Sequence, residues 1–239
     1  MKLYKILGVN CYQFNTVSDA KAFIKDIIIS EGGGYSVAIN AEKIMMYSKD
    51  INFRAIIDHS ILPIPDGSGA IIGMKILYNI NSIKLDLPKT IFECANESKF
   101  SLFLLGATEK VNFNTENSLN QKYPNINLVG RQNGYFDDEL VVFQQIKKLN
   151  PQIVVIAMGS PKQEKLAARL NEILPSALLI GCGGAFNILT GEVKRAPVFY
   201  QKNHLEWFYR LVKEPSRFKR QLILPVFLLK LIIKKFSRK

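Results

Sequence analysis

Short, wholly apolar runs alternate along the chain with longer stretches in which apolar residues recur every three or four positions. Five of the short runs predict strands: Tyr35–Ile39, Ser101–Leu105, Ile126–Val129, Ile153–Met158 and Leu178–Ile180. Six of the longer stretches predict helices: Val17–Ser30, Ala41–Lys49, Ala70–Leu77, Leu87–Glu97, Asp137–Leu149 and Gln163–Ile173. Strands that are apolar on both faces are typical of a parallel sheet covered by helices on each side. The pattern therefore predicts an α/β fold with a doubly wound, mostly parallel sheet.

The segments that follow the predicted strands are the first candidates for a site, because ligands bind beyond the carboxyl ends of the strands in doubly wound sheets. These segments are Asn40, Gly106–Thr108, Gly130–Phe136, Gly159–Glu164 and Gly181–Phe186. Asp66 stands in a comparable place, between an apolar run at 61–64 and a predicted helix. Its carboxylate suits two roles that the sequence leaves open. It caps the helix, or it acts as a general base beside the apolar run.

The segment Met158–Glu164 opens a predicted helix directly after the most apolar strand. Gly159 lets the backbone approach a ligand closely, and Pro161 suits the first helical turn. The helix N-terminus together with Lys162 favours an anion such as a diphosphate. The competing interpretation is a plain strand-to-helix turn, which needs glycine and proline in any case.

Two further loops combine glycine with aromatic or polar residues. After the last predicted strand, Gly183 and Gly184 permit amide groups to converge on an oxyanion or a nucleotide, or else form only a tight turn. In the loop that contains Arg131 and Gly134, Tyr135 suits stacking on a base or a sugar, or else anchoring of the loop in the core.

Charge is spread unevenly over the 239 residues. The 32 Lys and Arg and the 20 Asp and Glu give a formal net charge of +12, and residues 194–239 alone hold thirteen of the basic residues against two acidic ones. The preceding part is nearly neutral, so the basic segment predicts a local anionic partner. We expect a Rossmann-like body over residues 1–193 and a basic, helical, membrane-associating appendage over residues 194–239.

Several kinds of site have no signature in the sequence. A G-x-G-x-x-G fingerprint after the first strand, a P-loop and an Asp-x-Asp pair are missing, and the two histidines and three cysteines lack the spacing of metal ligands. Chemistry without a metal or cofactor is therefore favoured. The widely spaced cysteines indicate a reducing compartment, the first residues lack the apolar core of a signal peptide, and the longest apolar stretch, Leu222–Ile233, is too short to span a membrane.

The end of the appendage predicts an amphipathic helix from about Leu229 onward. Lys230, Lys234 and Arg238 would form one stripe, and Leu229, Ile232, Ile233 and Phe236 the opposite side. This pattern is typical of a helix that lies in the interface of an anionic membrane, so we expect peripheral binding at the cytoplasmic face. A basic arm for nucleic acid is the competing interpretation, but it leaves the many apolar residues unexplained, and no nucleic-acid partner is expected.

Eight short motifs are distributed over nearly the whole chain. They are Ala38–Glu42, Pro65–Gly67, Leu104–Gly106, Gly134–Phe136, Gly159–Glu164, Gly183–Gly184, Arg195–Pro197, and Glu206, Trp207, Arg210, Leu211, Glu214, Pro215, Arg217 and Arg220 as one spaced group. In order and spacing they resemble the WecG/TagA/CpsF family of bacterial glycosyltransferases. The resemblance implies an inverting, metal-independent transfer of a sugar, often of the N-acetylmannosamine type, from a UDP donor to a polyprenyl-diphosphate-linked acceptor sugar in surface polysaccharide biosynthesis.

The resemblance also implies roles for individual residues. Asp66 matches the proposed base that deprotonates the acceptor hydroxyl, and Asn40 and Gln163 match residues that line the same pocket. Arg210, Arg217 and Arg220 match arginines of an appendage that docks at the membrane and completes the site over the diphosphate. The expected substrate contacts in the body are Gly106, Arg131, Gly134, Tyr135, Gly159, Pro161, Lys162, Glu164, Gly183, Gly184 and Arg195.

Two departures from the family pattern bear on activity. Ala38 stands where many relatives have threonine, so a hydroxyl contact is lost. The family's R-x-x-G-x-D-L motif, aligned on Asp86, puts Asn81 at the arginine, unless a three-residue shortening lets Lys84 supply the cation. A second interpretation therefore stays open, a catalytically idle, membrane-docked subunit that binds a nucleotide sugar. Either interpretation allows a homo-oligomer.

Overall fold

A six-stranded parallel sheet forms the centre of the protein, whose computed structural model describes residues 1–197, 199–200, 206–213 and 222–237. The strand order is β4-β3-β8-β7-β5-β6, and all neighbouring strands are parallel. The strands are β3 (Gly34–Ile39), β4 (Leu62–Pro65), β5 (Ser101–Gly106), β6 (Asn127–Gln132), β7 (Ile153–Ala157) and β8 (Leu178–Gly181). A separate antiparallel hairpin consists of β1 (Lys2–Ile6) and β2 (Val9–Gln13).

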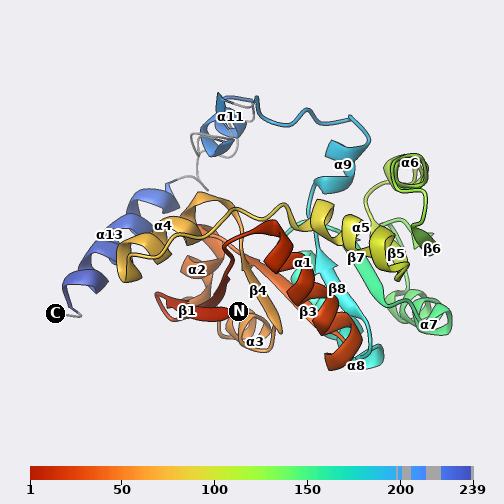
Figure 1. Cartoon of the computed structure of the whole chain (residues 1–239), viewed down its shortest axis with the longest axis horizontal. Helices are drawn as coiled ribbons and strands as arrows, with labels where there is room; N and C mark the ends of the chain where they lie inside the picture. Colours follow the sequence, from red (N-terminus) through yellow and green to blue (C-terminus); the bar gives the residue numbers. More distant parts are fainter. Residues whose placement is uncertain (198, 201–205, 214–221, 238–239) are drawn as a thin grey trace.

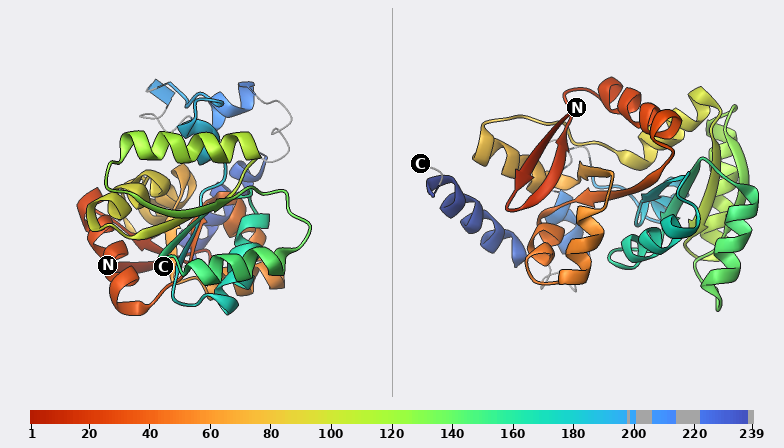
Figure 2. Two further views of the ribbon diagram at one scale, coloured as in Figure 1. Left: turned by 90° about the vertical axis from the view of Figure 1, so that its right-hand side faces the viewer. Right: turned by 90° about the horizontal axis from the view of Figure 1, so that it is seen from below.

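Helices cover both faces of this sheet (Figures 1 and 2). One core cluster packs the sheet against α2 (Ala41–Tyr47), α3 (Ile51–Asp58), α4 (Gly67–Tyr78), α7 (Glu139–Leu149), α8 (Lys162–Ile173) and α13 (Ile223–Phe236). The other packs it against α1 (Val17–Asp26) with the π-helical turn η1 (Ile27–Glu31), α5 (Leu87–Ser98), α6 (Glu109–Lys122) and α9 (Ala185–Leu189). Helix α11 (Glu206–Lys213) belongs to the basic segment. The prediction of a doubly wound, Rossmann-like parallel sheet is confirmed.

The sequence pattern missed one strand of the sheet and several helices for identifiable reasons. Strand β4 contains Pro63 and Pro65, which argue against a central strand, but β4 lies at the edge, where one side of the backbone needs no partner. Helix α6 is mostly polar, and its buried apolar side chains are only Val111 and Leu119. An apolar stripe that narrow gives little helical periodicity.

Helix α13 packs against α4 and α2 at one end of the body (Figure 1). It begins at Ile223, earlier than predicted, because Pro225 falls in the first turn, where a missing N–H removes no helical hydrogen bond. Phe227 and Leu231 are buried in the first core cluster. Gly73 lets α4 pack closely against the end of strand β1, since a Cβ at this position would lie 2.6 Å from an Ile6 methyl carbon. In the described part of the chain, no helix is both long and apolar enough to cross a membrane.

Candidate active site

The carboxyl ends of all six parallel strands lie at one edge of the sheet, so the segments singled out in the sequence gather there. The chain leaves β5 toward β6 on one side and leaves β7 toward β8 on the other. This reversal makes the ends of β5 and β7 the topological switch point of the sheet, the place where doubly wound sheets bind nucleotides.

Asn40 and Asp66 follow neighbouring strands, β3 and β4, whose last residues are paired in register. Asn40 caps α2, because its Oδ1 accepts the backbone N–H of Lys43 at 3.0 Å. Its Nδ2 donates to Asp66 Oδ2 at 3.5 Å. Asp66 occupies the N-cap position of α4 but makes no side-chain capping bond. Of the two roles that the sequence left open, capping is therefore not supported, and the half-buried carboxylate has Asn40 as its hydrogen-bond partner.

A buried ion pair joins this corner to the first turn of α8, which follows β7. Lys43 Nζ lies 2.7 Å from Glu164 Oε1 and donates to the Ala38 carbonyl at 2.9 Å. The side chains of Lys43 and Glu164 are only 5% and 2% exposed. A buried charge of either sign is costly without a partner, so these two side chains hold α2 and α8 in a fixed relation. Lys43 is not among the site residues predicted from the sequence.

Gln163 extends the same hydrogen-bonded chain to the loop after β8. Its Nε2 donates to Glu164 Oε1 at 3.1 Å, and its Oε1 accepts the N–H of Gly183 at 2.8 Å. The amide packs over Gly181, where a Cβ would lie 2.7 Å from Nε2. The structure thus joins Asp66, Asn40 and Gln163, the three residues that the family resemblance places in one pocket, through a single network.

The glycines at this edge fall into two groups. A Cβ on Gly106 would lie 2.5 Å from the Ala157 carbonyl oxygen, and one on Gly134 would lie 2.5 Å from Met158 Sδ. These two glycines allow the loops after β5, β6 and β7 to pack together. By contrast, a Cβ on Gly159, Gly183 or Gly184 would meet no atom within 4 Å. The side of the backbone to which a Cβ would be added therefore faces open space, which leaves room for a ligand.

Other predicted substrate contacts in the body have protein partners or are open to solvent. Arg131 forms ion pairs with Glu109 and Glu116 of α6, so its guanidinium is already neutralised. Tyr135 is 78% exposed on the loop before α7. Lys162 starts α8 and is exposed, with Pro161 at the preceding N-cap position.

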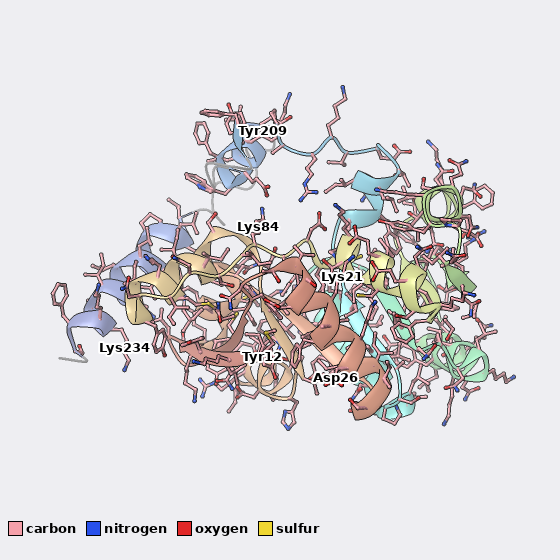
Figure 3. The ribbon with its side chains drawn as sticks, viewed as in Figure 1. Tyr12, Lys21, Asp26, Lys84, Tyr209 and Lys234 are labelled. Carbon is pink, nitrogen blue, oxygen red and sulfur yellow. The ribbon has the colours of Figure 1, made fainter. Side chains whose placement is uncertain are left out.

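Two ion pairs connect the body to the basic segment. Arg195 Nη1 lies 2.7 Å from Asp86 Oδ2, and Lys84 Nζ lies 2.6 Å from Glu206 Oε2 at the start of α11. Figure 3 shows Lys84 pointing from the body toward α11. Arg210 lies in α11, and its side chain is outside the described atoms, whereas Arg217 and Arg220 lie outside the described residues. Among the described residues, no three His, Cys, Asp or Glu side chains are grouped to hold a metal ion.

The fold and the site are typical of Rossmann-like group-transfer enzymes: a half-buried carboxylate follows β4, and glycines at which an added Cβ would meet open space follow β7 and β8. The sequence model of the Glycosyl transferase WecG/TagA/CpsF family matches residues 4–239. A relative from Bacillus subtilis (strain 168), named N-acetylglucosaminyldiphosphoundecaprenol N-acetyl-beta-D-mannosaminyltransferase, is 33% identical over 218 residues, which cover 90% of this chain and 85% of the relative. The chain belongs to the WecG/TagA/CpsF family and is a glycosyltransferase.

Proposed function

We propose that the protein transfers a sugar, of the N-acetylmannosamine type or a related hexose derivative, from a UDP donor to a polyprenyl-diphosphate-linked acceptor sugar, with inversion at the anomeric carbon. The observation that carries this proposal is the network from Asp66 through Asn40, Lys43, Glu164 and Gln163 to the Gly183 amide. It supports a base and an open anion loop in fixed relation at one edge of the sheet. The name of the Bacillus relative supports the choice of donor sugar and acceptor.

In this mechanism Asp66 removes the proton of the acceptor hydroxyl as that oxygen attacks the anomeric carbon. The new C–O bond forms while the bond to the β-phosphate oxygen breaks, and UDP leaves with the bonding electrons. A single displacement of this kind inverts the configuration. Asn40 orients the carboxylate through its 3.5 Å contact and leaves the second oxygen free for the acceptor.

In this proposal the donor binds beside the topological switch point between β5 and β7. Its diphosphate lies against the loops of Gly159 and Gly183–Gly184, on the side where an added Cβ would meet open space, with Lys162 beside them. The Gly183 N–H itself is held by Gln163 Oε1. Arginines of the basic segment, Arg210, Arg217 and Arg220, add charge over the diphosphate. Arg131 and Glu164, in contrast, position the loops through their ion pairs rather than touching the donor.

A UDP-release assay tests the function directly. A panel of UDP-sugars is incubated with a short-chain polyprenyl-diphosphate-GlcNAc acceptor, and release that depends on both substrates is expected for one donor. The idle-subunit interpretation, which Ala38 and Asn81 suggested, predicts donor binding without acceptor-dependent release. No release with any donor would favour it.

Gly184→Ala tests whether the loop after β8 contacts the donor. The added methyl group meets no protein atom, so the melting temperature stays close to that of the wild type, while the KM for the donor rises because the methyl group displaces the diphosphate. Gly106→Ala is the matched variant. The backbone at Gly106 has a φ of +113°, and an added Cβ would press against a backbone oxygen. Gly106→Ala is therefore expected to lower the free energy of unfolding by about 1–3 kcal/mol. An unchanged donor KM in Gly184→Ala would remove that loop from the donor site.

We also propose that the appendage docks peripherally at the cytoplasmic face of the membrane through α13. With Phe227 and Leu231 turned into the body, the outward face consists of Leu222, Val226, Leu229, Ile232, Ile233 and Phe236, all exposed. Flanking lysines suit an anionic leaflet. We propose in addition that the boundary between the body and the appendage lies after residue 193, and that the protein forms a homo-oligomer.

Phe236→Gln is expected to weaken binding to anionic vesicles by about 10-fold, because one exposed apolar side chain no longer leaves water. Cosedimentation measures the effect. Ile51→Gln, a similarly exposed apolar position on α3, is the control and leaves binding unchanged. Point substitution is preferable to deletion of the helix, which would also remove Phe227 and Leu231 from the core. Equal loss in both variants would contradict docking through α13.

A further inference from the structure

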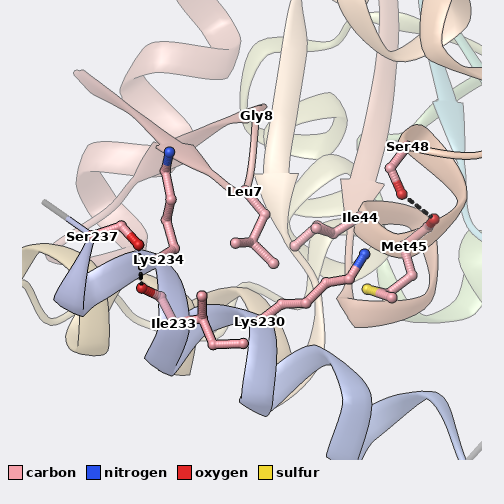
Figure 4. Close-up of a pocket in the computed structure, with 9 residues that line it drawn as sticks. All are labelled: Leu7, Gly8, Ile44, Met45, Ser48, Lys230, Ile233, Lys234 and Ser237. Carbon is pink, nitrogen blue, oxygen red and sulfur yellow. Dashed lines mark hydrogen bonds between the residues drawn. The ribbon is translucent and has the colours of Figure 1, made fainter.

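A cavity of about 480 Å³ lies between α13, α2 and the turn of the β1–β2 hairpin (Figure 4). Its apolar wall is formed by Leu7, Ile44, Met45 and Ile233. Lys230 and Lys234 of α13 line it as well, and Figure 4 shows Lys230 reaching toward α2 and Lys234 toward the hairpin, with Leu7 between them. The volume is in the range of small-molecule sites, about 300–1,000 Å³.

The two ammonium groups have no acidic partner within the described part of the chain. No carboxylate of a described residue lies within 4.0 Å of Lys230 or Lys234, whereas Lys84, for instance, is paired with Glu206. Two cations at the mouth of an apolar cavity complement a molecule that carries an anionic group on an apolar chain.

The cavity adjoins the outward face of α13. At 3.6 residues per turn, Lys230, Lys234 and Ser237 fall on one flank of the helix, and Ile233 lies between that flank and the outward face. Ile233 accordingly lines the cavity and is also 56% exposed. If the outward face meets the acyl region, the lysines of this flank lie at the level of the head groups.

We propose that this cavity binds one anionic phospholipid of the membrane, with its phosphate between Lys230 and Lys234 and the upper part of one acyl chain against Leu7, Ile44 and Met45. The inference rests on the proposed membrane docking but is separate from sugar transfer. It adds a specific lipid site to the general attraction of a basic segment for an anionic surface. Lys235, on the other flank, is outside the cavity.

Binding of a short-chain lipid below its micelle concentration tests the site without a membrane surface. Dioctanoyl phosphatidylglycerol is titrated into the full-length protein, and one saturable site is expected by native mass spectrometry and calorimetry. Lys230→Gln and Lys234→Gln should each weaken it by about 5-fold. Lys235→Gln, the matched control on the same helix, should leave it unchanged.

Comparison ligands show whether the site needs both an anionic group and an acyl chain. Dioctanoyl phosphatidylcholine that binds equally well would overturn the proposal, since the apolar wall alone would then suffice. Inorganic phosphate that saturates the site at the same concentration would also overturn it, since no lipid would be needed. Displacement of the phospholipid by an equimolar short-chain polyprenyl diphosphate would reassign the cavity to the acceptor. Because none of these measurements uses a sugar donor, loss of transferase activity cannot mimic a negative result.

Discussion

Asp66→Asn is expected to lower the turnover number by about 10²–10⁴-fold, the effect that typically follows loss of a general base. The amide of asparagine has the size of the carboxyl group but accepts no proton from the sugar hydroxyl. Donor affinity should be preserved, because the proposed nucleotide contacts lie on the loops after β7 and β8. Single-turnover kinetics with the UDP-sugar and lipid-linked acceptor measures the rate, and calorimetry measures donor binding.

Asp50→Asn is the matched control for this variant. Asp50 also stands at a helix N-cap, but its carboxylate does cap α3, accepting the N–H of Phe53 at 2.9 Å. Asparagine caps equally well, so both activity and stability should be unchanged. The Asp66→Asn protein should also keep its melting temperature, because no capping bond is lost. Full activity in Asp66→Asn would remove Asp66 from the mechanism.

The edge of the sheet that holds the site could be predicted from sequence because parallel strands have a strong signature. The run Ile153–Ala157 is wholly buried, and it is followed by Gly159 in the loop and Gln163 in the first turn of α8. Asn40 follows β3 in the same way. Once these strands are recognised as parallel, topology alone brings their ends together.

The partners of the individual polar side chains could not be predicted from the sequence. Glu164 and Arg131 carry charges that suit a ligand, yet in the structure each is paired with an opposite charge. Glu164 pairs with Lys43 of α2, and Arg131 pairs with Glu109 and Glu116 of α6, the helix before its own strand. One feature of the sequence indicates that Lys43 is buried: it stands between Ala41 and Ile44, which belong to a buried helix face. Its partner lies 121 positions away, and no local pattern records such a pairing.

Lys43→Met is expected to destabilise the protein by about 3–5 kcal/mol, because it leaves the Glu164 carboxylate buried without a counter-charge. One oxygen of that carboxylate, Oε2, already lacks a hydrogen-bond partner among the described residues. Lys110→Met is the control: it breaks an exposed ion pair with Glu192, which is worth about 0–1 kcal/mol. Urea unfolding of both variants measures the difference.

The double variant Lys43→Met/Glu164→Leu distinguishes a positioning role from a purely structural one. Replacing both charges by apolar side chains of similar size should recover most of the lost stability, since no buried charge is left uncompensated. Activity should not return, because Gln163 Nε2 loses its acceptor at 3.1 Å and no longer holds the Gly183 loop in place. A reduced kcat in a protein of near wild-type stability would therefore tie the ion pair to the geometry of the anion loop. Recovery of both stability and kcat would show that the pair serves the fold alone.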